Sequence, residues 1–353
     1  MKKINCNLFL IMFSALHAFS TPSGWVVGWG NNISGNVTGI PYSGFSTGVV
    51  TIAGQVLTNA VAIAAGRGHA LALRSDGTVA GWGNNYSGQA TGIKSTFPPY
   101  RASGVVTIDG QALSNAAAIS ACQFSAALKV DGTVAVWGLD GSGYKFNRSD
   151  LTNAVAVNAG EDHCLVLKKD GTLFSLDAGG VTPLGVSNVV AMATGRSYVT
   201  ASAGSDLALK MDGAVVGLYA GRIEEGSYLK KITNIITIEV SGMAAFALTK
   251  DGRVFGMGIN DRGQSTGVPT TNYIASGFVS IGGQFLTNIT AIASAGDCSY
   301  ALKKDGTVVA WGKLGSQPAS VPAGLSNVVA IAAGNNYCLA ITTNRAVADK
   351  FRQ

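Results

Sequence analysis

Histidines and adjacent acidic residues are the side chains best suited to proton transfer in this 353-residue chain. His69 and His163 can act as general bases, and Glu161 and Asp162 stand directly before the second of them. Successive residues of a strand point to opposite faces, so Glu161, Asp162 and His163 do not converge on one point. The acid pair at 224–225 meets the same objection. We therefore predict no catalytic residues and no enzymatic activity.

The chain has few residues of the kinds that bind a metal or a cofactor. There are only 3 His and 5 Cys, and six of the acids are aspartates of the repeated Asp-Gly turn typified by Asp76. A calcium site needs more clustered carboxylates than remain. The glycine-rich loops lack the Lys-Ser/Thr and the following helix of a phosphate cradle. We expect no metal and no cofactor.

The composition excludes several classes of protein. Charged residues make up 12% and hydrophobic residues 47% of the chain, too apolar a mixture for a disordered protein. The net charge of +6 is spread along the chain without a basic block, so no nucleic-acid partner is expected. We expect a monomer.

Residues 1–20 have the pattern of a secretory signal peptide. Lys2 and Lys3 precede an apolar stretch over 8–19, and Ala18 to Ser20 forms a small-x-small cleavage site. Cleavage would leave 21–353 as a single domain, secreted or periplasmic, without a membrane span. The alternative is an uncleaved anchor.

Export would expose the remaining cysteines to an oxidising compartment. They are Cys122, Cys164, Cys298 and Cys338, and three pairings are possible. Cys122 with Cys164, and Cys298 with Cys338, fall in successive repeats. Disulfides between neighbouring repeats and a role as small buried apolar residues both remain open.

One repeated unit organises the chain. Its clearest copy is LTNAVAIAAGRGHALALRSDGTVAGWG from Leu57, and similar copies start at Leu113, Leu151, Val186, Ile232 and Leu286. Each copy reads as short apolar strands joined by an Asp-Gly hairpin turn, with no sustained helical period. Repeats of about 40–55 residues indicate a propeller, a solenoid or an array. We predict an all-β fold.

The two ends of the repeat array are complementary halves of one unit. Residues 24–30 match the second half of the repeat, and 325–341 match its first half. The simplest account is a seven-bladed β-propeller, closed by pairing of the N-terminal strand with the C-terminal half-blade.

His69 and His163 occupy the same position in two copies of the repeat. Other copies place different residues there: Phe124, Tyr198, Ala244, Cys298 and Tyr337. A position that accepts such variety indicates packing or a local hydrogen bond rather than catalysis.

The motif Trp82-Gly-Asn-Asn-Tyr-Ser-Gly-Gln89, preceded by Ala-Gly-x-x-His and Asp-Gly-Thr-Val, resembles the regulator-of-chromosome-condensation repeat family. Residues 29–36 and 257–264 carry the same motif with substitutions. The resemblance covers nearly all of 21–353 and implies a seven-bladed propeller, here of the bacterial, secreted type. It does not imply one function, because a fold hosts many.

Three of the links between copies of the repeat are long, over 31–56, 84–112 and 259–285. Each contains Val-x-Ile, a turn and Gln-x-hydrophobic, which predicts an added hairpin. The links after repeats 2, 3, 4 and 6 are short, which predicts fewer strands in those blades. Aromatic residues with an arginine are common at protein interfaces, and the candidate binding residues on these links are Tyr42, Phe45, Tyr86, Phe97, Tyr100, Arg101 and Tyr273. The alternative is that they pack the hairpins onto the blades.

Three functions follow as hypotheses. The first is an exported scaffold that binds another protein or a surface polymer through loops on one face. The second is GTPase nucleotide exchange or chromatin binding, as in the eukaryotic branch of the family that the chain resembles. The third is a lyase or glycan hydrolase acting on one face of the ring. Export, the lack of catalytic groups and the variable links favour the first.

Overall fold

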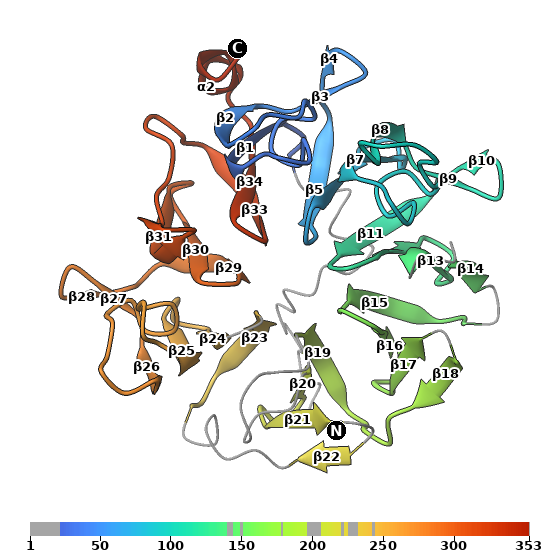
Figure 1. Ribbon diagram of the computed structural model, residues 1–353. Helices are drawn as coiled ribbons and strands as arrows, with labels where there is room; N and C mark the ends of the chain where they lie inside the picture. The colour runs from blue at the N-terminus through green and yellow to red at the C-terminus, as the bar shows by residue number, and fades with distance from the viewer. Residues whose placement is uncertain are drawn as a thin grey trace.

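The computed structural model describes residues 22–139, 144–148, 151–177, 179–195, 206–219, 222–224, 232–241 and 244–352. In these residues the strands form seven four-stranded antiparallel sheets, arranged as blades around one axis (Figure 1). This confirms the predicted all-β, seven-bladed propeller. The predicted signal peptide, 1–20, lies outside the described residues.

Each blade contributes one strand to each of four concentric positions. The innermost strands are β5 (Ala60–Ala65), β11 (Ala116–Ala121), β15 (Ala154–Ala159), β19 (Val189–Thr194), β23 (Ile235–Val240), β29 (Ile289–Ala295) and β33 (Val328–Gly334). The second strands are β6 (His69–Arg74), β12 (Ser125–Lys129), β16 (Cys164–Lys168), β20 (Asp206–Lys210), β24 (Ala244–Thr249), β30 (Cys298–Lys303) and β34 (Tyr337–Thr342). We number the blades 1 to 7 in this order.

The two outer positions follow the same order of blades. The third strands are β7 (Val79–Asn84), β13 (Val134–Leu139), β17 (Leu173–Asp177), β21 (Val215–Tyr219), β25 (Val254–Ile259), β31 (Val308–Leu314) and, in blade 7, β1 (Trp25–Asn31). The outermost strands are β8 (Arg101–Val105), β14 (Tyr144–Arg148), β18 (Gly180–Pro183), β22 (Arg222–Glu224), β26 (Ile274–Phe278), β32 (Gln317–Pro318) and, in blade 7, β2 (Phe45–Val49).

The three added hairpins that the long links predicted are confirmed. They are β3 (Thr51–Ile52) with β4 (Gln55–Val56), β9 (Thr107–Ile108) with β10 (Gln111–Ala112), and β27 (Ser280–Ile281) with β28 (Gln284–Phe285). Each precedes the innermost strand of the next blade.

One detail of the sequence-based prediction is wrong. Blades 2, 3, 4 and 6 do not lack an outer strand, because β14, β18, β22 and β32 complete them. A short link is sufficient because the fourth strand turns back directly along the third. The chain also ends in a helix, α2 (Arg345–Lys350), and the side chain of Asn344 accepts hydrogen bonds from its first amides. A helix this short leaves no periodic signal in the sequence.

The Asp-Gly turns between second and third strands are held by the threonine that follows. Thr78 donates to Asp76 Oδ1 from its backbone N–H at 2.9 Å and from its hydroxyl at 2.6 Å. These hydrogen bonds hold the pKa of Asp76 below its ordinary value. Gly77 has a φ of +79°, a conformation that glycine adopts without strain. The turns at Asp131, Asp170 and Asp305 carry the same hydrogen bonds.

An asparagine before each innermost strand places the chain for the contact between blades. In the described residues these are Asn59, Asn115, Asn153, Asn188, Asn234, Asn288 and Asn327, with φ between +54° and +60°. Asparagine tolerates this left-handed conformation better than most residues. The next N–H then reaches the preceding blade: Ala116 donates to the carbonyl of Gly77 at 3.0 Å. The same 3.0 Å hydrogen bond joins Ala154 to Gly132, Val189 to Gly171, Ile289 to Gly252 and Val328 to Gly306.

Blade 7 is assembled from both ends of the described chain. Strand β1 pairs antiparallel with β34, with Trp25 opposite Thr342 and Gly30 opposite Tyr337. The order β2-β1-β34-β33 places these segments side by side in the ring, as Figure 1 shows. At the seam with blade 1, Gly24 and Ala60 exchange backbone hydrogen bonds of 2.9 and 3.2 Å. The backbone groups of the first strand are therefore satisfied within a sheet.

The repeat position that holds the two histidines faces the following blade. His69 Nε2 lies 2.8 Å from the Ser125 hydroxyl of blade 2. In blade 7, the Tyr337 hydroxyl donates to the carbonyls of Gly66 and His69 in blade 1, at 3.0 and 2.6 Å. The interaction is therefore a hydrogen bond between blades rather than a local one.

Both faces of each blade are buried, which explains the nearly continuous apolar strands of the repeat. Phe124 and Leu128 of blade 2 belong to one core cluster with Val157 and Val166 of blade 3. Phe124, Leu128 and Val166 have no exposed surface. The core is thus a series of layers between blades rather than one central mass.

We expect Tyr337→Phe to weaken the closing contact between blades 7 and 1. Loss of the hydroxyl removes two buried hydrogen bonds and should lower the free energy of unfolding by about 1–2 kcal/mol. Urea denaturation followed by circular dichroism measures the change. Tyr42→Phe removes the same hydroxyl from an exposed side chain and should change stability by less than about 0.5 kcal/mol. Equal effects of the two substitutions would contradict the closing role.

We expect the contact of His163 with blade 4 to depend on pH. Its Nε2 lies 2.7 Å from Asp206 and its Nδ1 lies 2.8 Å from Asp162. Burial lowers the pKa of His163, but the hydrogen bonds and charges of these acids outweigh burial and raise it to about 9. The stabilisation is complete below the unfolded-state pKa of about 6.5 and is lost as the pH rises through about 9.

The variant that tests this contact is His163→Gln. It should be less stable than the original chain by roughly 2–3 kcal/mol near pH 6, and the difference should shrink between pH 6.5 and 9. Denaturant unfolding at several pH values measures it. A difference that does not change with pH would show that His163 is neutral in the folded protein.

Candidate functional site

Three long loops leave the same face of the ring. They join the third to the fourth strand, over 32–44 in blade 7, 85–100 in blade 1 and 260–273 in blade 5. In a four-stranded antiparallel meander, the connections after the first and third strands lie at one end, and the connection after the second lies at the other. The three loops therefore share a face, which we call the loop face. The Asp-Gly turns lie on the opposite face.

A buried asparagine organises each of these loops. Asn85 Oδ1 accepts hydrogen bonds from the amides of Ala90 and Thr91, at 3.0 and 3.1 Å. Its Nδ2 donates to the carbonyl of Ile93 at 2.7 Å and to the hydroxyl of Ser95 at 3.0 Å. Because one amide side chain forms hydrogen bonds with backbone groups along the loop, the loop needs no hydrophobic core of its own.

The other two loops repeat this arrangement with the same residue types. Asn32 bonds the amide of Val37 and the carbonyl of Ile40, and Asn260 bonds the amide of Thr266 and the carbonyl of Val268. Asn32 and Asn260 are buried. The asparagine at the fourth position of this Trp/Met-Gly-x-Asn motif therefore holds each loop in one conformation.

Each long loop is also attached to the following blade through a tryptophan. The carbonyl of Gln89 accepts a hydrogen bond from Trp137 Nε1 at 3.0 Å. Asn36 and Gln264 play the same part for Trp82 and Trp311, both at 2.9 Å. The sequence signal for this pairing is a tryptophan in the repeat that follows a long link, and the sequence analysis missed it.

The seven candidate binding residues lie on or beside these loops, and most are exposed. Tyr42, Phe45, Phe97 and Tyr273 are 60%, 53%, 79% and 59% exposed. Tyr86 is also exposed, whereas Tyr100 and Arg101 are half-buried. These exposed side chains have much of their surface open to solvent.

Within blade 1 the aromatic residues form a small supported group. The rings of Tyr86 and Tyr100 meet edge to face, with centroids 5.1 Å apart. The Lys94 ammonium lies 5.3 Å from the centre of the Tyr86 ring. These contacts restrict the side chains before any partner arrives.

The candidates gather in two places rather than one. Blades 7 and 1 are neighbours in the ring, whereas the loop of blade 5 is separated from blade 7 by blade 6 (Figure 1). The structure therefore brings together the candidates of blades 7 and 1 and leaves Tyr273 apart. The sequence analysis overlooked Ile40 and Ile93, which occupy equivalent loop positions and are 61% and 56% exposed. We define the blade 7–1 surface as six exposed apolar side chains on or beside these two loops: Tyr42, Phe45, Ile40, Ile93, Tyr86 and Phe97.

The two histidines first considered for catalysis lie apart, but Asp162 and His163 do meet, contrary to the prediction, with Asp162 Oδ1 2.8 Å from His163 Nδ1. Residues 161–163 precede β16 and belong to no strand, so strand alternation does not separate their side chains. His69 and His163 lie between different pairs of blades. Glu224 belongs to β22, and residue 225 lies outside the described residues. The four cysteines that the structure describes are thiols, with Cys122 half-buried and the others buried. Burial raises the pKa of Cys164 to about 12, which makes this thiol unreactive.

The described residues also provide two further observations. They bring no group of three or more His, Cys, Asp or Glu side chains together in a way that would hold a metal ion. No helix among them has both the length and the apolar character needed to cross a bilayer.

Comparison with known proteins points to one repeat family. The sequence profile of the regulator of chromosome condensation (RCC1) repeat matches residues 60–89. HERC3, a probable E3 ubiquitin-protein ligase of Homo sapiens, is 33% identical over 141 residues, which are 35% of this chain and 13% of that protein. The chain therefore corresponds to a small part of this relative's length.

Solved structures extend the similarity in fold to almost the whole chain. Yeast RCC1 (Prp20) bound to Kap60 has a TM-score of 0.68 at 16% identity, over 99% of this chain and 96% of that one. Human WBSCR16 has a TM-score of 0.65 at 15% identity, over 91% of this chain and 100% of that one. At such identities the likeness concerns the fold alone. In its repeats and its seven blades, the chain is similar to the regulator of chromosome condensation repeat family, whose sequence profile matches residues 60–89.

Proposed function

We propose that the protein is an exported propeller scaffold that binds another protein, or a surface polymer, through the loop face. The observation that carries the proposal is the blade 7–1 surface, where exposed aromatic and aliphatic side chains stand on loops fixed from within by Asn32 and Asn85. Apolar and aromatic side chains held in one conformation are typical contact residues, because binding costs them little entropy.

Export and a protein partner have separate support. The charged start, apolar stretch and small-residue site of residues 1–20 support export. A protein partner is supported by relatives in fold, since yeast RCC1 is described in complex with Kap60, and its binding to Gsp1p and histones is described as well.

The first prediction concerns export. Fractionation of the native cells should recover the protein outside the cytoplasm, and sequencing of its N-terminus should begin at Thr21. Recovery in the cytoplasm with Met1 retained would contradict export and would leave the binding surface to be tested by itself.

The second prediction concerns the surface. Tyr42→Ala combined with Phe45→Ala and Phe97→Ala should weaken partner binding at least tenfold, because contact residues of this kind each contribute about 1–2 kcal/mol or more. Crosslinking from the exported fraction, followed by titration of the recovered partner, measures the loss.

The matched control is Phe285→Ala combined with Met211→Ala. These side chains are 66% and 69% exposed, and they lie on connections that leave the opposite face. The control should bind as the original chain does, and both variants should keep the original unfolding midpoint. Equal binding by all three proteins would refute the blade 7–1 surface as the binding site.

A further inference from the structure

The innermost strands expose one position to the axis of the ring, five residues after the left-handed asparagine. The seven residues there are Ala64, Ser120, Asn158, Ala193, Glu239, Ala293 and Ala332. Glu239 is the only charged residue in any of the seven innermost strands. A carboxylate among alanines is unexpected, because small uncharged side chains serve the packing of the other blades.

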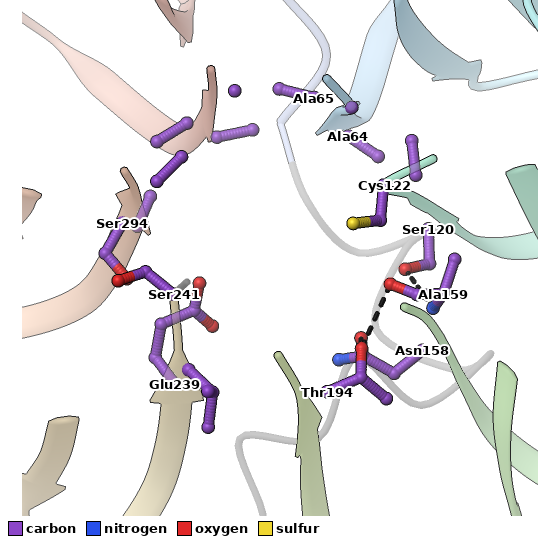
Figure 2. Close-up of a pocket in the computed structure, with 18 of the residues that line it drawn as sticks. Ala64, Ala65, Ser120, Cys122, Asn158, Ala159, Thr194, Glu239, Ser241 and Ser294 are labelled. Carbon is purple, nitrogen blue, oxygen red and sulfur yellow. Dashed lines mark hydrogen bonds between the residues drawn. The ribbon is translucent and has the colours of Figure 1, made fainter. Parts of the chain in front are cut away.

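This position lines a cavity of about 280 Å³ on the axis. All seven innermost strands contribute to its wall, which combines alanine and isoleucine methyl groups with polar side chains and backbone groups. Figure 2 shows Glu239 with its carboxylate directed into the open space, beside Ser241 and Ser294. Ser120, Asn158 and Thr194 lie across the space from it.

Glu239 has no cation to balance its charge among the described residues. The amide of Ser294 donates a hydrogen bond to it, but burial dominates and raises the pKa of the carboxyl to about 8. Arg67 lies at the wall of the same cavity and does not contribute to this shift. The neighbouring strands β19, β24 and β29 carry no charged residue, and β20 carries Asp206 and Lys210 at its two ends.

A second polar group at the same wall lacks a hydrogen-bond partner. The hydroxyl of Ser294 is buried and has no hydrogen-bond partner among the described residues. Ser294 is only 6% exposed, and an unsatisfied buried hydroxyl usually costs about 1–3 kcal/mol. Across the cavity, by contrast, Thr194 is satisfied by Asn158 Oδ1 at 2.7 Å. Among the buried side-chain atoms of this wall, the hydroxyl of Ser294 is therefore the one without a partner among the described residues, and it lies beside Glu239.

From this arrangement, we propose that the axial cavity binds a small organic primary ammonium ion, with Glu239 and Ser294 as its polar contacts. An ammonium group has three donors and one positive charge, which match a carboxylate and a hydroxyl acceptor. The alanine and isoleucine methyl groups in the wall can contact a short aliphatic tail. A metal ion fits less well, because the described residues supply only one carboxylate here and group no three metal-binding side chains.

The test is calorimetric titration of the full chain with n-butylammonium, compared with n-butanol as a neutral ligand of the same shape. The ammonium should bind at least tenfold more tightly. Because Glu239 must lose its proton, its affinity should rise about tenfold between pH 7 and pH 9. Near pH 7, binding should release close to one proton, measured in buffers of different ionisation enthalpy.

Three variants separate this site from nonspecific binding. Glu239→Gln should bind n-butylammonium at least tenfold more weakly and lose the pH dependence. Ser294→Ala should bind it several-fold more weakly and keep the pH dependence. Asp109→Asn, an exposed residue of the β9–β10 turn, is the matched acid-to-amide control and should bind as the original chain does. Equal affinity for n-butanol, unchanged binding by Glu239→Gln, or no binding at millimolar ligand would each overturn the proposal.

A stability measurement tests the state of Glu239 without any ligand. A carboxyl whose folded-state pKa is raised costs stability as the pH rises from its unfolded value of about 4.5 to about 8. Glu239→Gln should therefore gain in melting temperature relative to the original chain between pH 5 and pH 8. A difference that stays constant over this range would show that Glu239 is solvated, and the ammonium site would lose its basis.

Discussion

A single backbone hydrogen bond between successive blades determines the geometry of this ring. In five of the Asp-Gly turns the carbonyl of the glycine accepts the first N–H of the next innermost strand, as Gly77 does from Ala116. The bond forms because the preceding asparagine adopts a left-handed conformation and directs that N–H sideways. The two most constant parts of the repeat, Leu-Thr/Ser-Asn and Asp-Gly, thus form the two sides of this contact between blades. At the seam, Gly24 and Ala60 make an equivalent junction.

With the frame fixed by backbone groups, side chains are free to differ from blade to blade. The position of His69, His163 and Tyr337 illustrates this freedom, since each makes a different hydrogen bond to the next blade. The axial position shows it again, with Glu239 among small residues. Three loops on one face carry the largest differences, and a buried asparagine in each holds them as firmly as the strands. Rigid loops on a rigid ring are well suited to recognition.

The repeats were sufficient to predict the seven blades and the three added hairpins, because both depend on patterns that recur. The outer strands β14, β18, β22 and β32 were missed for a physical reason. A strand of two to five residues that pairs on one side has little apolar character, so its sequence resembles a loop. The binding residues were chosen by type, and exposure then depended on neighbours: Tyr42 and Phe97 are open, whereas Tyr100 lies against Tyr86. Neither the axial setting of Glu239 nor the unpartnered hydroxyl of Ser294 can be recognised without the closed ring.

Each long loop is hydrogen-bonded to the tryptophan of the next blade, so two separate segments of the sequence depend on each other. Deleting the loop of blade 1 would leave the Trp137 indole without its acceptor, and moving that loop elsewhere would require a tryptophan downstream. Trp29 follows the short link of blade 6 and has no such loop to bond. Its buried Nε1 has no acceptor among the described residues. A new recognition surface of this kind therefore requires both a loop and a tryptophan in the third strand of the following blade. Recombination that exchanges such two-part cassettes would diversify the surface while leaving the ring intact.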